Sequence, residues 1–200
     1  MVRKVTIERE ASLMLTHIMV DLETWGTNPY STIISIGACV FDPYATEANA
    51  IITDRFEVAI DPATCAAHGL RIDATTVQWW MAPEREPARA AWLGTPKVSL
   101  PEALDGFGDW LRPYSLDEAG MRMWGNGADF DNVLLHQAYE ATKRDAPWSF
   151  RHNRCFRTLR NLLTFEEGHY LGTRHTALAD AEAQAIRANQ IVRKLGIKLT

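Results

Sequence analysis

The sequence predicts a single α/β domain built around a mixed β-sheet. The first observation is a series of three apolar, strand-like runs within residues 15–60, separated by turn residues, which is typical of an antiparallel meander. The second is that short apolar runs and segments of helical periodicity alternate in the rest of the chain. The third is composition: 46% hydrophobic and 23% charged residues in a chain of 200 are ordinary for a globular protein with a substantial core.

The first 60 residues contain a tail and the meander. Residues 1–14 are mixed and charged, so we expect an N-terminal tail or short extension there, and a single domain over 15–200. The first strand begins at Leu15 and ends near a pair of acidic residues. Residues 32–41 are almost all apolar, which fits a strand covered on both faces. A third strand is expected at about 51–60.

The rest of the chain should complete the sheet and cover it with helices. The stretch from 61 to 100 is irregular, with three prolines and short helical pieces. Ser99 is a suitable N-cap for the helix that follows it. Helices are expected at 99–111, 130–141 and 178–192, the last with a small-residue face, and strands at 121–124 and 155–159. The prediction is therefore a mixed five-stranded sheet, an antiparallel meander plus parallel strands, flanked by helices.

Composition also limits the function. The formal net charge of −4, with 25 acidic and 21 basic residues, argues against a general nucleic-acid coat protein, whose affinity would need a positive excess. The three cysteines show no C-x-x-C spacing, so we expect reduced thiols and no zinc site. A long apolar span and a signal-peptide pattern are both missing from the sequence, so we expect a soluble, cytoplasmic protein without a membrane partner.

The most informative stretch is residues 19–26, which places Asp21 and Glu23 two residues apart at the end of the first strand. Side chains alternate faces along a strand, so the two carboxylates point the same way. Ionised carboxylates held on one face repel each other unless a cation lies between them. Oxygen ligands of this kind suit hard ions such as Mg²⁺ or Mn²⁺, so the pair predicts half of a metal site.

Further acidic residues and a histidine occur near the starts of two helices. Asp129 and Asp131 lie at the start of the helix that follows the fourth strand, and Asp180 lies in the first turn of the last helix. Taken alone, each could simply cap a helix or favour its positive N-terminal end. His175, five residues before Asp180, would by itself more often be a surface or capping residue.

Considered together, these residues indicate phosphoryl-transfer chemistry. A single sheet could bring together four carboxylates, namely Asp21, Glu23, Asp131 and Asp180. Two cations clamped by such carboxylates can stabilise the attacking and leaving oxygens of an in-line phosphoryl displacement. A neutral histidine such as His175 can take a proton from an attacking water.

Three motifs in the chain resemble those of a known family. They are similar to the exonuclease motifs of the DEDDh 3′–5′ exonucleases, and they read Asp21-x-Glu23, Asn126-x-x-x-Phe130-Asp131 and His175-x-x-x-x-Asp180. That superfamily has a ribonuclease-H-like fold and includes proofreading subunits, oligoribonuclease and ribonuclease T. The motif order matches over nearly the whole chain. Two further segments, 76–80 and 155–159, resemble the branch that contains phage exodeoxyribonuclease A and the mycobacterial-type exoribonuclease.

The resemblance implies a two-metal exonuclease that releases nucleoside 5′-monophosphates from the 3′ end of single-stranded DNA or RNA. Its cofactors would be two divalent cations. These would be Mg²⁺, for which Mn²⁺ could substitute. By their positions in the motifs, Asp21, Glu23 and Asp180 would hold the first cation. Asp21 would also bridge to the second, which Asp131 would complete directly or through water.

The resemblance also implies roles for residues around the carboxylates. His175 would be the general base, and the backbone around Thr24 and Trp25 would contact the terminal 3′-hydroxyl. Trp25 departs from the small or aliphatic residue that most relatives have there. Asp131 is preferred to Asp129 because it fits the N-x-x-x-F-D spacing, and Asp129 would then cap the helix.

The adjacent tryptophans Trp79 and Trp80 allow two interpretations. Neighbours on a helix point about 100° apart, so one can be core and the other exposed. Packing of both under the irregular segment is favoured over a base-stacking platform, for which Trp80 is the candidate. Nearby arginines could meet phosphates, although solvated surface charge is the more common role; they are Arg71, Arg85 and Arg89.

Two other functions compete with the exonuclease. A non-catalytic binding module on the same fold is disfavoured because such modules usually lose their metal carboxylates. A ribonuclease-H-type endonuclease is disfavoured by the H-x-x-x-x-D and N-x-x-x-F-D motifs. The choice between DNA and RNA stays open, because it depends on whether a group reaches the 2′-hydroxyl. Oligomeric state is also open, with a homodimer a candidate because relatives often form one.

Overall fold

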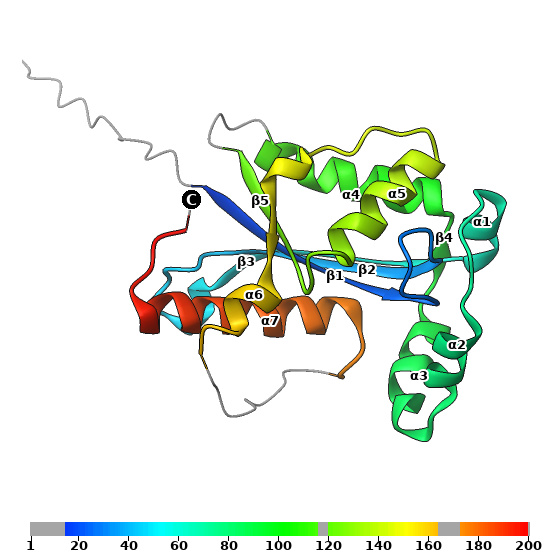
Figure 1. Ribbon diagram of the computed structural model, residues 1–200, viewed down its shortest axis with the longest axis horizontal. Helices are drawn as coiled ribbons and strands as arrows, with labels where there is room; N and C mark the ends of the chain where they lie inside the picture. The colour runs from blue at the N-terminus through cyan, green and yellow to red at the C-terminus, as the bar shows by residue number, and fades with distance from the viewer. Residues whose placement is uncertain (1–14, 116–119, 164–172, 200) are drawn as a thin grey trace, which may run out of the picture.

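The computed structural model describes residues 15–115, 120–163 and 173–199, so the tail expected at 1–14 lies outside the described residues. Its centre is a mixed sheet in the order β4-β3-β2-β1-β5-β6 (Figure 1). The strands are β1 (Thr16–Thr24), β2 (Ile33–Phe41), β3 (Ile52–Ile60), β4 (Lys97–Val98), β5 (Met121–Gly125) and β6 (Asn153–Cys155). The α/β class and the mixed sheet flanked by helices are confirmed.

The three long strands form the antiparallel meander that their apolar runs predict. β2 is buried at all nine positions, because β1 and β3 flank it and helices cover its two faces. β5 pairs with β1 in parallel, so the carboxyl ends of these two strands lie at the same edge of the sheet. In sheets of this kind, side chains at that edge are well placed to bind ligands.

Two details differ from the five-stranded sheet that the sequence predicts. Residues 97–98 pair in parallel with the end of β3, which adds a sixth strand too short to produce an apolar pattern. The prediction of a strand at 155–159 was wrong in its position. β6 ends at Cys155, and helix α6 (Phe156–Arg160) begins directly after it. The two buried residues of α6 lie three positions apart in the sequence, a spacing that fits a helical turn and not the alternation of a strand.

Helices cover both faces and one end of the sheet (Figure 1). In the figure, α4 and α5 lie on one side of the sheet, α6 and α7 lie on the other, and α2 and α3 lie beside the end of β1. The helices are α1 (Pro62–Ala67), α2 (Ala74–Met81), α3 (Glu86–Gly94), α4 (Leu100–Ser115), α5 (Asp131–Ala141), α6 and α7 (Ala177–Leu195). Short 3₁₀ turns are η1 (Ala48–Ala50), η2 (Pro83–Arg85) and η3 (Phe150–His152).

Each face of the sheet has its own hydrophobic core. On one face, side chains of β1 and β2 such as Val20 pack with α4 and α5 around the fully buried Phe107. On the other, Met19 packs against α7, whose predicted small-residue face is confirmed by Ala181, Ala185 and Ala188. α7 can approach so closely because of Gly37: a Cβ there would lie 2.1 Å from the backbone at the start of α7.

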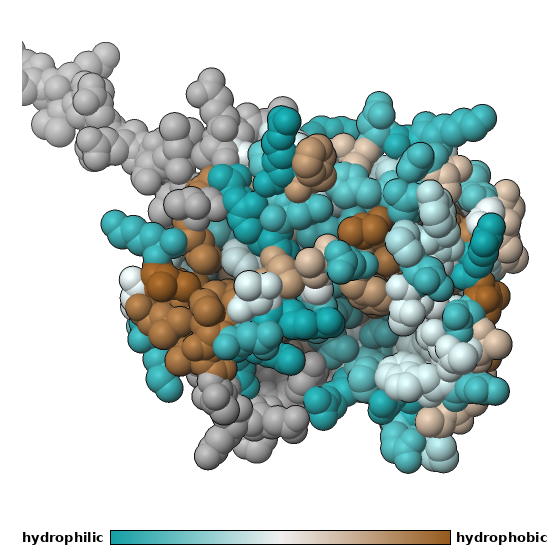
Figure 2. Space-filling view, viewed as in Figure 1, coloured by the Kyte–Doolittle hydropathy of each residue, from teal (hydrophilic) through white to brown (hydrophobic). Residues whose placement is uncertain are grey.

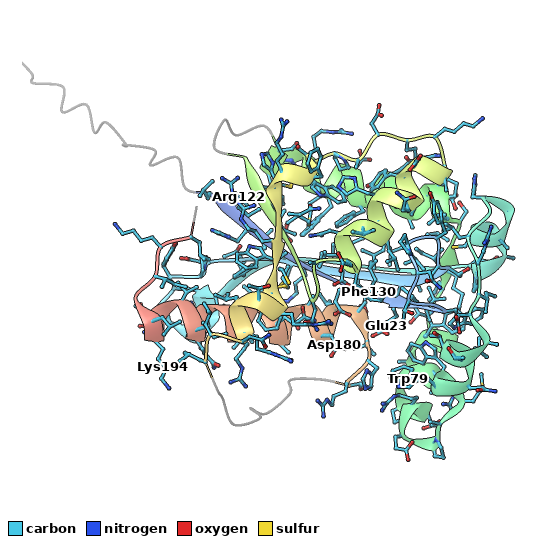
Figure 3. The ribbon with its side chains drawn as sticks, in the orientation of Figure 1. Glu23, Trp79, Arg122, Phe130, Asp180 and Lys194 are labelled. Atoms are coloured by element: carbon cyan, nitrogen blue, oxygen red, sulfur yellow. The ribbon has the colours of Figure 1, made fainter. Side chains whose placement is uncertain are left out.

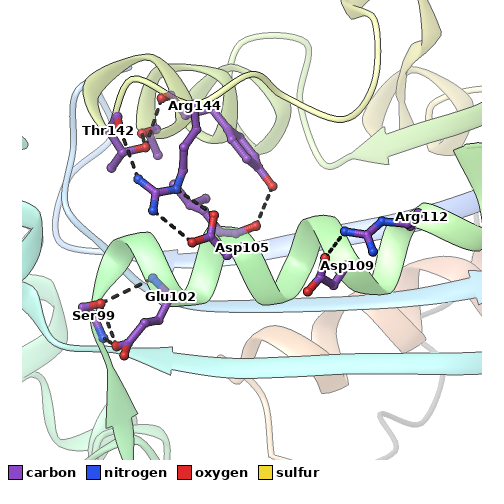
Figure 4. Close-up of polar contacts among 10 residues, drawn as sticks. Ser99, Glu102, Asp105, Asp109, Arg112, Thr142 and Arg144 are labelled. Carbon is purple, nitrogen blue, oxygen red and sulfur yellow. Dashed lines mark hydrogen bonds and ion pairs between the residues drawn. The ribbon is translucent and has the colours of Figure 1, made fainter.

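Helix α4 has the predicted start and a link to α5 (Figure 4). The backbone N–H of Glu102 donates to Ser99 Oγ at 3.3 Å, and the N–H of Ser99 donates to the Glu102 carboxylate at 2.9 Å. This reciprocal pair is a capping box, which confirms Ser99 as the N-cap. Arg144, just after α5, donates two hydrogen bonds to Asp105 of α4 at 2.7 and 2.9 Å.

Indole and guanidinium donors anchor α2 and α3 to the sheet. Trp80 Nε1 donates to the carbonyl of Thr24 at 2.9 Å, and Trp92 Nε1 donates to that of Ile34 at 3.0 Å. Arg89 of α3 donates to the carbonyls of Trp80 and Ala82 at the end of α2. A third buried cluster forms here from Ile34, Trp80 and Ala88. The segment that looks irregular in sequence is thereby held at the end of β1.

On the face drawn in Figure 2, hydrophobic side chains gather over the C-terminal end of α7. Leu195 is 38% exposed there, and Ile197 and Leu199 pack partly buried against the core. All three cysteines are free thiols. Within the described residues, every helix is too short or too polar to span a membrane.

Candidate active site

The predicted carboxylate pair lies near the end of β1. Asp21 and Glu23 are half-buried on the face of the sheet that α7 covers, as their spacing of two residues predicts. Their partners on β2 are Gly37 and Ser35, which are both small, so little side-chain volume competes for this corner. The register with β2 shifts by a bulge directly after Glu23, which ends the regular ladder beside the pair.

Asp180 joins this pair from the far end of the sequence. It lies in the first turn of α7, where the helix touches the sheet at Gly37. One carboxylate oxygen from each of Asp21, Glu23 and Asp180 lies within 4.8 Å of the other two. Figure 3 shows Glu23 and Asp180 together at the N-terminal end of α7, with the labelled Arg122 and Lys194 far from them.

Asp131 is held beside the cluster by backbone amides. It begins α5, and its carboxylate accepts the N–H of Leu22 at 3.1 Å and the N–H of Asn126 at 2.6 Å. The fit is close, because a Cβ at Gly125 would lie 2.9 Å from that of Asp131. Asp131 is outside the group of oxygens within 4.8 Å, but its charge acts on both carboxylates of β1.

The competing Asp129 is exposed. The expectation that it caps α5 was wrong, because Phe130 is the N-cap and no side chain makes a capping hydrogen bond. Arg157 donates to the carbonyl of Asn126 at 2.7 Å. It thus supports the loop that holds Asp131.

Burial and mutual repulsion raise the pKa values of the acidic residues. The pKa of Asp21 lies well above its ordinary value, first because of burial and then because of the charges of the other three carboxylates. Burial and the charges of Asp180 and Asp131 raise the pKa of Glu23 to about 8. Burial raises the pKa of Asp131 to about 6, although its two amide hydrogen bonds oppose the rise. A nearby cation would favour the ionised form of these carboxylates at neutral pH.

The donor set fits a hard divalent cation. Every ligand in the cluster is a carboxylate oxygen, which Mg²⁺ and Mn²⁺ prefer over nitrogen or sulfur. Oxygens on opposite sides of an octahedral Mg²⁺ lie about 4.2 Å apart. Only one pair of the three can lie opposite, and adjacent ligand oxygens are about 3 Å apart, so a group within 4.8 Å would contract around such an ion.

Gln184 is a site residue that the sequence analysis missed. Its Nε2 donates to Asp21 Oδ1 at 2.6 Å, while its Oε1 is buried and accepts no hydrogen bond from the described residues. Because Gln184 lies four residues after Asp180 on α7, both face the same side of the helix. That helical spacing was the available signal. The contact orients Asp21 and opposes the rise of its pKa.

His175 lies on the loop that leads into α7. Its backbone has φ +64°, a left-handed conformation that is uncommon outside glycine and is often found at functional sites. Its backbone N–H donates to the Asp180 carboxylate at 3.1 Å, which ties the loop to the cluster. Burial and then the charge of Arg85 lower the pKa of the His175 imidazole, so the ring is neutral at pH 7.

The two tryptophans take different positions. Trp80 is 4% exposed and packs in the third cluster, whereas Trp79 is 41% exposed. The interpretation in which both are core was therefore wrong for Trp79, and Trp79 instead of Trp80 presents an open indole. The edge of one ring meets the face of the other between Trp79 and His175, with centroids 5.1 Å apart. Figure 3 shows Trp79 on α2, close to the carboxylates.

Several backbone groups of Thr24 and Trp25 already form hydrogen bonds within the protein. The N–H of Trp25 donates to the carbonyl of Thr32 at 2.9 Å, and its carbonyl accepts from the N–H of Asp73 at 2.7 Å. The carbonyl of Thr24 accepts from Trp80 Nε1. Each carbonyl oxygen keeps a second lone pair that could receive a hydroxyl, so the 3′-hydroxyl contact stays a prediction. A cleft adjoins this corner, lined in part by Glu23, Ser35, Trp80, Trp92 and His175.

A meander followed by parallel strands, with carboxylates converging from β1 and α7, defines an α/β domain with an acidic site at one edge of its sheet. It is similar to the nuclease domain of 3′hExo, a DEDDh family member, bound to rAMP (TM-score 0.59, 14% identity, 92% of this chain and 94% of that chain). It is also similar to cell-death related nuclease 4, CRN-4 (TM-score 0.59, 13% identity, 90% of this chain and 64% of that chain). A third similar structure is E. coli exonuclease I in complex with a dA16 oligonucleotide (TM-score 0.56, 17% identity, 90% of this chain and 41% of that chain). At such identities these similarities establish a shared fold.

The family follows from the sequence match. Residues 16–192 match the family of Rv2179c-like 3′–5′ exoribonuclease domains, and the chain belongs to that family. A search of curated protein sequences gives no significant match. The resemblance to the DEDDh exonucleases is confirmed, and so is the ribonuclease-H-like class of the fold.

Proposed function

We propose that this protein is a divalent-cation-dependent 3′–5′ exonuclease that releases nucleoside 5′-monophosphates from the 3′ end of single-stranded DNA or RNA. One observation carries the proposal: Asp21, Glu23 and Asp180 converge within 4.8 Å, and a hydrogen bond ties His175 to the third of them. Membership of a family described as 3′–5′ exoribonuclease domains supports it.

The carboxylates would bind two cations, Mg²⁺ with Mn²⁺ as a substitute. Asp21, Glu23 and Asp180 would hold one, and Asp21 and Asp131 would share the other. Bound cations would supply electrostatic stabilisation of the attacking and leaving oxygens in an in-line displacement. Both Asp131 oxygens accept backbone amides, so Asp131 would contribute through its remaining lone pairs or through water.

His175 would act as the general base. A lowered pKa keeps its imidazole neutral, and a neutral ring nitrogen can accept the proton of the attacking water. The hydrogen bond from its backbone to Asp180 and the ring contact with Trp79 restrict where the imidazole can lie. Trp79 would also offer its exposed indole for stacking with a base, which tolerates any sequence.

A labelling experiment tests the direction of cleavage. The protein is incubated with Mn²⁺ and a single-stranded oligonucleotide labelled at its 5′ end or its 3′ end. We expect the 3′ label to leave at once as a mononucleotide and the 5′ label to appear in a descending ladder. Internal cuts would favour a ribonuclease-H-type endonuclease, and binding without cleavage under any divalent ion would favour a non-catalytic module. Matched single-stranded DNA, single-stranded RNA and duplexes with a 3′ overhang then define the substrate.

A further inference from the structure

Three arginines near the tryptophan pair differ in what their guanidinium groups contact. Arg89 donates hydrogen bonds to two backbone carbonyls at the end of α2, and Arg71 is exposed. Arg85, the last residue of η2, is half-buried and packs on the Trp79 ring, which contacts His175. Arg85 is thus the one of the three with both burial and proximity to the site.

The position of Arg85 is fixed by an aromatic ring. Its guanidinium carbon lies 4.2 Å from the centroid of the Trp79 ring, and Trp79 in turn contacts the His175 ring. The charge of Arg85 acts on two groups of the site, lowering the pKa values of Glu23 and His175. Arg85 therefore lies against the ring that contacts the His175 imidazole.

The hydrogen-bond donors of Arg85 are not used within the described residues. Its Nε is buried and has no hydrogen-bond acceptor, and the ion pairs found there do not include Arg85. A buried donor without an acceptor is costly, and native proteins usually satisfy it with a ligand or water. The Trp79 ring has no oxygen or nitrogen acceptor, so this contact leaves the N–H groups of the Arg85 guanidinium available to a ligand.

We propose that Arg85 binds the scissile phosphate, the group that becomes the 5′-phosphate of the released nucleotide. This inference rests on the proposed function. In that reaction the phosphate lies between the carboxylates and the general base, and Arg85 and His175 contact the same Trp79 ring. A planar fork of N–H donors matches two phosphate oxygens, and a positive charge there offsets the negative charge that the substrate brings to an acidic site.

Binding of adenosine 5′-monophosphate and of adenosine, each with Mn²⁺ and measured by calorimetry, tests the proposal. The two probes differ only in the phosphate, so the ratio of their affinities reports the phosphate contact. We expect Arg85→Gln to reduce this ratio about tenfold or more, and Arg85→Lys, which keeps the charge without the fork, to reduce it less. Arg112→Gln on α4, on the other face of the sheet, is the control and should leave the ratio unchanged.

The outcomes separate a substrate contact from a supporting role. If Arg85 only holds Trp79 in place, Arg85→Gln weakens both probes equally and the ratio stays constant, which overturns the proposal. Thermal unfolding of each variant shows whether the fold is retained, and Arg85→Lys provides the test if Arg85→Gln does not fold. Failure of the wild-type protein to cleave any 3′ end would instead refute the proposed function, independently of the affinity ratio.

Discussion

Replacing Glu23 with glutamine should stabilise the protein when divalent cations are removed, and the gain should grow with pH. The pKa of Glu23 rises from its ordinary 4.5 to about 8 on folding. Between these values the folded protein binds more protons than the unfolded chain. The free energy of unfolding therefore falls as pH rises through this window, and the loss is complete above about pH 8.

The size of the effect follows from the same rise. At about 1.36 kcal/mol for each pH unit, a change from 4.5 to about 8 gives the ionised site a penalty of about 5 kcal/mol. The carboxylates share this penalty and solvent screens part of it, so we expect Glu23→Gln to gain about 2–4 kcal/mol at about pH 8.5. At about pH 5, where Glu23 is protonated in the folded protein, the gain should be small.

Urea unfolding in EDTA at both pH values measures this difference. Glu84→Gln, the same substitution at an exposed position of η2, is the control and should change stability little at either pH. Added Mn²⁺ should stabilise the wild-type protein more than Glu23→Gln, because the cation relieves a repulsion that the variant lacks. Equal stability of wild type and Glu23→Gln at about pH 8.5 in EDTA would refute the carboxylate repulsion.

Three further predictions concern single residues. Asp21→Ala should abolish cleavage of a labelled oligonucleotide while circular dichroism shows an intact fold, since Asp21 would contact both cations; residual cleavage near the wild-type rate would contradict the bridging role. His175→Ala should slow cleavage by about 10²–10⁴-fold with Mn²⁺ affinity nearly unchanged by calorimetry, and an unaltered rate would remove the general-base assignment. Gly37→Ala should lower the free energy of unfolding by at least about 2 kcal/mol, because its Cβ would lie 2.1 Å from the backbone of α7. Gly106→Ala is its control: nothing lies within 4 Å of a Cβ there, so stability should rise by about 0.5–1 kcal/mol, and equal effects of the two substitutions would count against the close approach of α7.

Local patterns in the sequence were enough to predict most of the fold. The alternation of side chains along a strand places Asp21 and Glu23 on one face, and the structure brings that face to α7. The capping box at Ser99 and the alanine face of α7 are likewise local features, and both are confirmed. The two errors in the sheet, a missed β4 and a shifted β6, concern strands of two and three residues, which are too short to show a period.

The candidate site could be predicted only in part from the sequence, and the tertiary structure decided the rest. By itself, the sequence determined which carboxylates and which histidine could act together, because their motifs have a fixed order and spacing. Only the tertiary structure decided that Trp79 is open and Trp80 buried, that Gln184 holds Asp21, and that Arg85 packs on the Trp79 ring. The physical reason is that exposure and unsatisfied donors result from packing between distant segments, such as Asp21 and Gln184, which are 163 residues apart. No local period encodes such contacts.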